Sequence, residues 1–344
     1  MTPERKLKVQ NILIIIMVGL CFGLIYNYLF YPHSLTEFLE AGSISIILGF
    51  FVGVLEEFIL RDVFRNKPFL LLSAIRALLY SLLVSVTLSL VLSIEISIVE
   101  EVSYTEALFQ YLLGPLFQRD FIFSFVFIIF MLFSLQVILI VGKSNFIRLM
   151  AGLYHQPREI SRIFMFVDLK NSTSIAESLS NMVFSSFIRD FYYDISDAII
   201  MFKGEIYQYV GDEIVVVWRV KNHRSNSVKC FFKMQEIIDG KRDKYKSMYG
   251  IVPEFKAGIH GGKVVVTAVG KQKREIVYHG DVLNTASRIE GKCNELNQDL
   301  LTSEDIIKMV DVGSEFIVEK KGEIELRGKA DKLNLFGIRR ANKY

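Results

Sequence analysis

The chain has 344 residues, of which 77 are charged, and a formal net charge of +3. That length suits about two domains of ordinary size. The net charge is too small to suggest nucleic acid as a partner, and three widely separated cysteines fit neither a disulfide framework nor a metal site. The charges are unevenly distributed, with 19 in residues 1–142 and 58 in residues 143–344. The first segment falls far below the ~25% charged residues usual in soluble domains.

The charge-poor segment is predicted to cross a membrane four times. A helix needs about 20 apolar residues to cross a hydrocarbon core of ~30 Å. The second of four apolar runs reaches this length only if Glu56 and Glu57 sit at the level of the lipid head groups. A cleavable signal peptide is disfavoured for the first run, because its apolar stretch is too long and no small-residue cleavage site follows. The runs cover residues 12–31, 41–55, 77–94 and 121–142.

Basic residues predict the orientation, because short loops rich in Lys and Arg favour the cytoplasm. Three such residues precede the first run and three follow the second, whereas segments 32–41 and 95–120 contain only Arg119 against seven acids. We therefore expect a multi-pass protein of the plasma (inner) membrane, in contact with lipid, with both ends in the cytoplasm. The basic residues are Arg5, Lys6, Lys8, Arg61, Arg65 and Lys67.

Two features of the apolar runs leave their interpretation open. Two glycine pairs with a spacing of four fit close helix–helix packing, although glycine is common in membrane helices. Glu56, Glu57 and Arg76 are either a sensing cluster or boundary residues that pair or reach the head groups. The glycine pairs are Gly19/Gly23 and Gly49/Gly53.

Residues 143–160 are predicted to link the membrane part to a soluble domain. Apolar side chains recur there at helical spacing, at Phe146, Leu149, Met150 and Leu153, which predicts a short amphipathic helix. The expected organisation is a four-helix transmembrane domain at 1–142, a linker or coupling helix at 143–160 and a soluble domain at 161–344.

The soluble segment alternates between strand and helix patterns, which predicts a ferredoxin-like α+β core. A capping box of Ser174 and Glu177 is expected to begin the first helix. A tight turn at residues 211–212 is expected to join two strands. The predicted strands are 163–167, 205–210, 213–218, 254–260 and 263–269, and the predicted helices are 174–202, 225–247 and one from residue 281.

Two carboxylates stand out in this pattern. Asp168 ends a buried strand, and Asp212 lies at the tip of the hairpin. If these strands are neighbours, the two acids lie side by side and repel each other unless they share a cation. Mg²⁺ held by one or two carboxylates and by substrate phosphates suits such a pair. A helix that starts near Ser172 would direct free N–H groups at those phosphates.

Four motifs occur in order: FVDLKNST, YQYVGDEIVVVW, KAGIHGGKVVV and GDVLNTASRIEG. Together they resemble the catalytic domain of class III adenylate/guanylate cyclases over about residues 160–340. The resemblance implies conversion of ATP to 3′,5′-cyclic AMP and pyrophosphate, two Mg²⁺ or Mn²⁺ ions per active site, and a homodimer with shared sites. This intramolecular attack on phosphorus depends on positioning and charge neutralisation.

The resemblance also assigns roles to the residues nearest the reaction. Asp168 and Asp212 match the metal-binding acids, and the backbone carbonyl of Leu169 completes a metal site. Asn284 and Arg288 match the pair that orients the ribose and stabilises transition-state charge on the nucleotide held by the other subunit. A spacing of four on a helix places both side chains on one face.

Further matches concern the triphosphate. Lys256, just before GIH, and Arg327, in LRGK, occupy positions that contact the triphosphate in the family. The backbone at Ser172 and Thr173 matches the turn that surrounds the phosphates.

The sequence departs from the family where the base is read. The usual polar pair is replaced by Gln208 and Val277. Gln can bond either purine and Val offers no hydrogen bond, so these two residues do not decide between ATP and GTP. ATP is expected because it is the commoner substrate among bacterial-looking members of the family. Thr267 also replaces a family glycine.

Three other functions are alternatives to an adenylate cyclase. A diguanylate cyclase shares the two-metal hairpin, but Val210 replaces the first glycine of its GGDEF-like tip. A catalytically silent nucleotide sensor would fit the unusual base pocket, whereas the intact acids, Asn284 and Arg288 argue against it. A transporter is disfavoured because few polar residues occur in the apolar runs.

Overall fold

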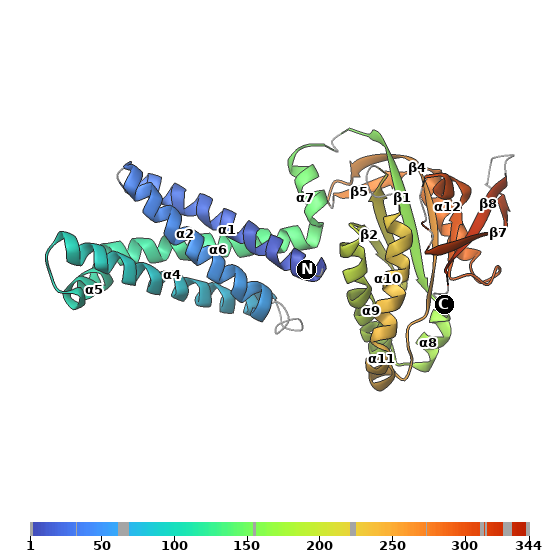
Figure 1. The fold of residues 1–344 in the computed structure, drawn as a ribbon, viewed down its shortest axis with the longest axis horizontal. Coiled ribbons are helices and arrows are strands. Elements are labelled where there is room, and N and C mark those ends of the chain that lie inside the picture. The colour runs from blue at the N-terminus through green and yellow to red at the C-terminus, as the bar shows by residue number, and fades with distance from the viewer. Residues whose placement is uncertain are drawn as a thin grey trace. The chain divides into compact units, whose positions relative to one another are not determined.

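The structure is a computed structural model, and the chain in it divides into two compact units, Met1–Lys143 and Ser144–Tyr344 (Figure 1). Each unit has buried apolar clusters of its own. The residues that the structure describes are 3–31, 33–60, 69–153, 156–220, 225–272, 274–309, 313, 315–325 and 332–341.

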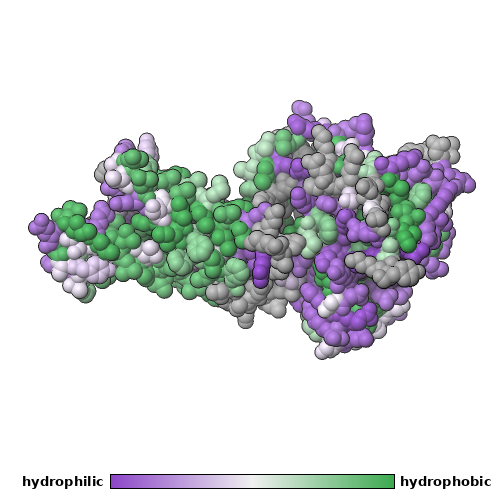
Figure 2. Space-filling view, viewed as in Figure 1, coloured by the Kyte–Doolittle hydropathy of each residue, from purple (hydrophilic) through white to green (hydrophobic). Residues whose placement is uncertain are grey.

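The N-terminal unit is helical, and among the described residues four helices are long and apolar enough to cross a membrane: Lys8–Phe30, Leu35–Phe58, Leu71–Val99 and Pro115–Ile138. Their surface is largely hydrophobic (Figure 2). This confirms the four predicted apolar helices, the second of which begins before residue 41. The elements are α1 (Pro3–Phe30), α2 (Leu35–Leu55), the π-helix η1 (Glu56–Leu60), α4 (Phe69–Val99), the unpredicted α5 (Tyr104–Leu113) and α6 (Pro115–Val141).

Helices α1 and α2 pack closely through their glycines. A Cβ atom at Gly49 would lie 2.8 Å from the Cα of Ile16, and one at Gly23 would overlap the side chain of Ser45. Only residues without a side chain permit this approach, so the glycine spacing in both helices reflects helix–helix packing.

The charged residues at the end of α2 are paired. Arg76 contacts Glu56 at 3.0 Å, and the hydroxyl of Tyr80 also donates to Glu56. Glu57 is buried and accepts a hydrogen bond from the Asn11 amide at 2.8 Å. These contacts favour the interpretation of Glu56, Glu57 and Arg76 as paired residues rather than a free sensing cluster. The basic residues Arg61, Arg65 and Lys67 lie outside the described residues.

The C-terminal unit contains one sheet in the order β2-β3-β1-β4-β6-β8-β7, and β5 pairs with β4. The part β4-β1-β3-β2 is antiparallel and has the expected ferredoxin-like order. Strand β6 pairs in parallel with β4. The strands are β1 (Arg158–Leu169), β2 (Glu205–Val210), β3 (Glu213–Arg219), β4 (Phe255–Val269), β5 (Glu275–His279), β6 (Leu300–Ser303), β7 (Phe316–Glu325) and β8 (Lys332–Arg340).

Alternate residues of the central strands divide between two faces of the sheet. Met165, Ile259 and Trp218 belong to the larger buried cluster, which includes side chains of α9 and α10. Phe164 and Val215 belong to a smaller cluster on the opposite face, together with side chains of α12. The helices of this unit are α7 (Lys143–Met150), α8 (Ser172–Ser178), α9 (Asn181–Met201), α10 (Asn226–Gly240), α11 (Arg242–Tyr249), α12 (Asp281–Gly291) and α13 (Glu304–Met309).

Two predicted helices are divided in the structure, and two predicted strands are joined into one. The helix expected over 174–202 is broken at Leu179, which has an extended backbone, and Ser180 caps the second part. Because α8 begins at Ser172, Ser174 lies inside this helix and does not cap it. Asn171 is the residue that precedes the helix. The helix expected over 225–247 is interrupted at Lys241. The strands expected over 254–260 and 263–269 form one continuous strand, β4.

Helix α7 confirms the amphipathic segment after the apolar runs, but it ends at Met150. Arg148 of this helix is 6% exposed and makes two hydrogen bonds, each of 3.2 Å, with the carboxylate of Glu205. Glu205 begins β2, the strand that leads to Asp212. The linker is therefore attached to one strand of the candidate site.

Candidate active site

Three charged residues form a row across the middle of the sheet. Asp168 of β1 is directly opposite Glu213 of β3 on one side and Lys256 of β4 on the other. Strand alternation places all three on the face of Phe164, under α12. Lys256 is 6% exposed, and its ammonium lies 3.0 Å from the Asp168 carboxylate.

Helix α12 adds a further acid above this row. Its Glu290 is 7% exposed and accepts a hydrogen bond from Lys256. The helix lies directly on β4, since a Cβ atom at Gly258 would come within 2.2 Å of the Glu290 backbone nitrogen and 2.6 Å of the Ala286 oxygen. Gly258 therefore permits the close approach that brings Glu290 to Lys256.

Asp212 reaches the same place from the turn between β2 and β3. Gly211 has φ +62°, which glycine adopts without strain. The hydroxyl of Tyr192 donates to the Gly211 carbonyl at 3.0 Å and fixes the turn. The charge of Asp212 raises the pKa of Asp168, so the turn brings the two carboxyl groups within electrostatic range of each other.

Among the residues that the structure describes, the site contains more acidic than basic side chains. Burial raises the pKa of Asp168, Lys256 opposes this, and Asp212 adds to it. Burial and the charges of Glu290, Asp168 and Asp212 raise the pKa of Glu213 to about 7. The pKa of Glu290 is also raised by burial, although Lys256 lowers it in part. Among the described residues, four carboxyl groups thus gather around the ammonium of Lys256, which forms ion pairs with Asp168 and Glu290, and such an arrangement attracts cations.

The donor set fits a hard divalent cation. Asp168, Asp212 and the Leu169 carbonyl offer oxygen ligands only, as Mg²⁺ and Mn²⁺ prefer. Within the described ranges, no group of three or more His, Cys, Asp or Glu side chains is arranged to hold a metal ion. Such a site suits Mg²⁺, which keeps several waters and takes ligands from substrate phosphates.

The predicted phosphate-binding residues are partly brought together. Ser172 and Thr173 are the first residues of α8, three positions after Leu169 ends β1. Lys256 reaches Asp168, as described above. Arg327 lies outside the described residues.

Asn284 and Arg288 lie on the exposed side of α12. Val282, Ala286 and Ile289 form the buried side of the same helix. Both predicted catalytic side chains therefore face away from the core and from the row of charges beneath the helix.

The two base-recognition candidates come from different strands. Gln208 is exposed on β2, after a bulge at residue 207, and Val277 is half-buried on β5. Their neighbours Tyr207 and Tyr278 contact each other with ring centroids 5.1 Å apart. This contact joins β2 to β5 across the face of the sheet.

Sequence reasoning did not identify Glu213 or Glu290 as parts of the site. Both lie inside recognised motifs, and strand alternation could have placed Glu213 beside Asp168. Glu290 could not be found in this way, because its position depends on the contact between α12 and Gly258.

Comparison with known proteins identifies the family of the chain. The profile of the adenylate and guanylate cyclase catalytic domain matches residues 154–339, more than half of the chain. The chain belongs to this family. The match covers β1 to β8 and therefore the row of charges, Asp212 and the exposed face of α12.

The chain resembles cyclases with different named substrates. It is 31% identical over 209 residues to adenylate cyclase 2 of Rhizobium meliloti (strain 1021), covering 60% of this chain and 58% of that protein. It is 24% identical over 166 residues to the receptor-type guanylate cyclase gcy-28 of Caenorhabditis elegans, covering 48% of this chain and 13% of that protein. The chain thus spans little more than half of the first relative and far less of the second.

A solved structure of a bacterial light-regulated adenylyl cyclase is also similar. It matches with a TM-score of 0.49 and 17% identity, over 55% of each chain.

Proposed function

We propose that the protein is a membrane-bound adenylate cyclase that converts ATP to 3′,5′-cyclic AMP and pyrophosphate at a homodimer interface, in intracellular signalling. The observation that carries the proposal is the meeting of Asp168 and Asp212 at the edge of a carboxylate-rich site. Family membership and the adenylate cyclase relative support it.

Asp168, Asp212 and the Leu169 carbonyl would hold two Mg²⁺ or Mn²⁺ ions. When bound, these ions neutralise the triphosphate and lower the pKa of the attacking 3′-hydroxyl. Lys256 is close enough to Asp168 to neutralise phosphate charge at the same place. The first turn of α8 and Arg327 are proposed to bind the remaining phosphate oxygens.

Asn284 and Arg288 act on the nucleotide held by the partner subunit in this proposal. Asn284 orients the ribose, and Arg288 stabilises the charge that develops as pyrophosphate leaves. Their exposure on α12 supports a role outside their own subunit.

Guanylate cyclase activity is the second candidate. Gln208 can donate and accept, so it can bond adenine or guanine. One of the relatives is named a guanylate cyclase. The cyclic product formed from each nucleotide distinguishes the two candidates.

The full chain, purified with lipid, is incubated with Mn²⁺ and ATP, GTP, CTP or UTP in separate reactions. Mass spectrometry identifies the cyclic product, and released pyrophosphate is measured in parallel. We expect cyclic AMP from ATP as the main product. Cyclic GMP alone would establish the second candidate, and no product from any nucleotide would leave only a silent nucleotide sensor.

Asp212→Ala is expected to lower turnover at least about a hundredfold, because the site loses one of its two metal-binding acids. Asp239→Ala is the matched control, since Asp239 is 66% exposed and, among the described residues, its carboxylate pairs only with Arg242 of the neighbouring helix. Equal activity of the two variants would exclude a catalytic role for Asp212.

A further inference from the structure

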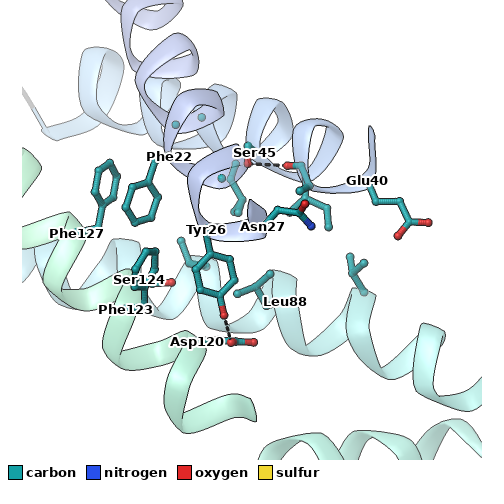
Figure 3. A pocket seen from close by; sticks show the side chains of 18 of the residues that line it. Phe22, Tyr26, Asn27, Glu40, Ser45, Leu88, Asp120, Phe123, Ser124 and Phe127 are labelled. Carbon is teal, nitrogen blue, oxygen red and sulfur yellow. Dashed lines mark hydrogen bonds between the residues drawn. The ribbon is translucent and has the colours of Figure 1, made fainter. Parts of the chain in front are cut away.

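The N-terminal unit contains a cavity of ≈ 190 Å³ between α1, α2, α4 and α6 (Figure 3). An engineered apolar cavity of about 150 Å³ in another protein binds benzene, so this space is sufficient for part of a small organic molecule. One side of the cavity is apolar. There the rings of Phe22 and Phe127 lie against each other, and Phe123 stacks on Phe22 with ring centroids 4.9 Å apart.

The other side of the cavity carries a polar group without a partner. Asn27 lines the cavity and is 3% exposed. Its carbonyl oxygen is fully buried and has no hydrogen-bond partner among the described residues. A buried acceptor left in this state costs free energy, which a ligand that donates a hydrogen bond would recover.

Three carboxylates line the same end. Glu37 and Glu40 come from the start of α2 and Glu95 from the end of α4, and Glu95 is within electrostatic range of both. In the described part of the chain, no ion pair is formed by any of them. Figure 3 shows Glu40 beyond Asn27, on the side that faces away from Phe22 and Phe127.

Asp120, the fourth acid of the cavity wall, differs because its charge is already compensated. Arg119 donates to Asp120 at 3.0 Å, Tyr111 donates at 3.0 Å, and Tyr26 donates to the same carboxylate. Among the described residues, the cavity groups that lack an ion pair or a hydrogen-bond donor are therefore Glu37, the exposed Glu40 and Glu95, and the buried carbonyl oxygen of Asn27.

We propose that this cavity binds an amphipathic organic cation, with its apolar body against the aromatic side and an N–H-bearing ammonium group at the acidic end. An ammonium group meets both requirements, because it carries a positive charge for the carboxylates and donors for the Asn27 oxygen. A soluble amine with an alkyl chain and an aminolipid of the bilayer share this chemistry. In the orientation predicted from the basic loops, the acidic end lies away from the cytoplasm.

The test measures binding directly, independently of nucleotide turnover. The full chain is placed in lipid nanodiscs of phosphatidylcholine and phosphatidylglycerol and titrated with n-octylammonium by calorimetry. Empty discs correct for partition into lipid, and n-octanol is the neutral control. We expect saturable binding of n-octylammonium and none of n-octanol.

Substitutions test whether the acidic end of the cavity binds the ammonium group. Glu40→Gln with Glu95→Gln is expected to weaken n-octylammonium binding about tenfold, as two partly exposed ion pairs are lost. Glu106→Gln, an exposed acid of α5 outside the cavity, should bind as the unmodified chain does. Asn27→Leu should also weaken binding, and the two Gln changes keep the test valid if this variant fails to fold.

A second set of discs contains phosphatidylethanolamine and identifies the source of the ligand. Weaker apparent binding of n-octylammonium there would mean that an aminolipid occupies the cavity, and unchanged binding would indicate a soluble amine. The proposal is overturned if n-octylammonium and n-octanol bind alike, if neither binds saturably in either set of discs, or if the double variant binds as tightly as Glu106→Gln.

Discussion

Lys256 is the residue on which the charge balance of the site depends. Burial works against its charge, but Glu290 and Asp168 raise its pKa above the ordinary lysine value. The ammonium is therefore held in place before a nucleotide binds, beside the acid proposed to bind metal. A cation positioned in advance loses little free energy to reorganisation when phosphate arrives.

Lys256→Gln is expected to lower kcat/KM for the nucleotide about a hundredfold, because the phosphates lose a fixed positive charge. Lys263→Gln is the control on the same strand; its side chain is 74% exposed and pairs with Glu159 at the surface. Fluorescence of Trp218, the only tryptophan and a buried core residue, measures how much of each variant is folded. A decrease no larger than the unfolded fraction explains would contradict the role given to Lys256.

Asp194 is a buried acid outside the site that ties α9 to α11. It accepts hydrogen bonds from Lys241 at 2.8 Å, Tyr245 at 2.8 Å and Lys244 at 3.2 Å. Burial alone would raise its pKa, but the hydrogen bonds of Lys241 and Tyr245 outweigh burial and lower it. The folded state thus favours the ionised form more than the unfolded state does.

Asp194→Asn is expected to destabilise the catalytic unit by about 2 kcal/mol near neutral pH, because two ammonium groups lose their partner. The contribution of Asp194 is fully present above its unfolded pKa and is lost as the pH falls through its lower native pKa. The difference between the two proteins should therefore decrease in acid. Unfolding followed by Trp218 fluorescence at several pH values measures this, and a pH-independent difference would show that the charge is not responsible.

At the scale of elements, the junction of α12 and β4 positions the site. The helix carries Asn284 and Arg288 on its exposed side and Glu290 on its buried side. Its distance from β4 is set at Gly258, where backbone atoms of the helix occupy the space of a side chain. Any residue with a Cβ atom must displace the helix together with these three side chains.

Gly258→Ala is expected to destabilise the catalytic unit by about 2–3 kcal/mol, since the added methyl meets backbone rather than a flexible side chain. Gly291→Ala, at the end of the same helix, has nothing within 4 Å of the new methyl and should change stability by less than about 0.5 kcal/mol. Urea unfolding of both variants gives the comparison. Similar stability of the two would mean that α12 moves away from β4 at little cost.

The accuracy of the sequence predictions varied with the kind of contact that defines each element. The four long apolar helices and the central strands could be predicted, because long apolar runs and alternation define them locally. The breaks at Lys241 and in the region of Leu179 could not. At Lys241 the cause is tertiary, since the interruption places Lys241, Lys244 and Tyr245 around the buried Asp194.

The gap predicted within β4 falls on two glycines. Gly261 and Gly262 lie between the two predicted strands, but they pair with Ile163 and Arg162 in a continuous ladder. A Cβ atom at Gly261 would lie 2.9 Å from the side chain of Ile306, so this glycine permits α13 to pack closely against β4. The paired acids Asp168 and Asp212 were predictable from strand ends, whereas Glu290 entered the site only through the packing of α12.

At the scale of the whole molecule, each subunit carries the proposed metal-binding acids on one surface. The residues proposed to act on the ribose and on the transition-state charge lie on another surface. Asp168 and Asp212 lie together beside α8, whereas Asn284 and Arg288 are exposed on α12. Tyr209 and Val210, next to the Asp212 turn, expose about half of their side chains. A two-fold dimer would cover these apolar groups and bring Arg288 of one subunit to the acids of the other.

Mixing two inactive variants tests this arrangement. Asp168→Ala and Arg288→Ala subunits each form dead homodimers, but a mixed dimer contains one site with both an intact acid and an intact arginine. If subunits exchange at random, half of the dimers are mixed and each has one working site of two. Activity should then recover to about a quarter of the unmodified value, the share set by two-fold symmetry.

The control mixture combines Asp168→Ala with Asp212→Ala subunits. Both changes damage the metal-binding part of the subunit that carries them, so a mixed dimer has no intact site and should stay inactive. Recovery in the first mixture alone requires that the acids and Arg288 of one site come from different subunits. If both mixtures stay inactive although size measurements show that mixed dimers form, each subunit must use its own Arg288, and α12 must turn toward its own acids during the reaction.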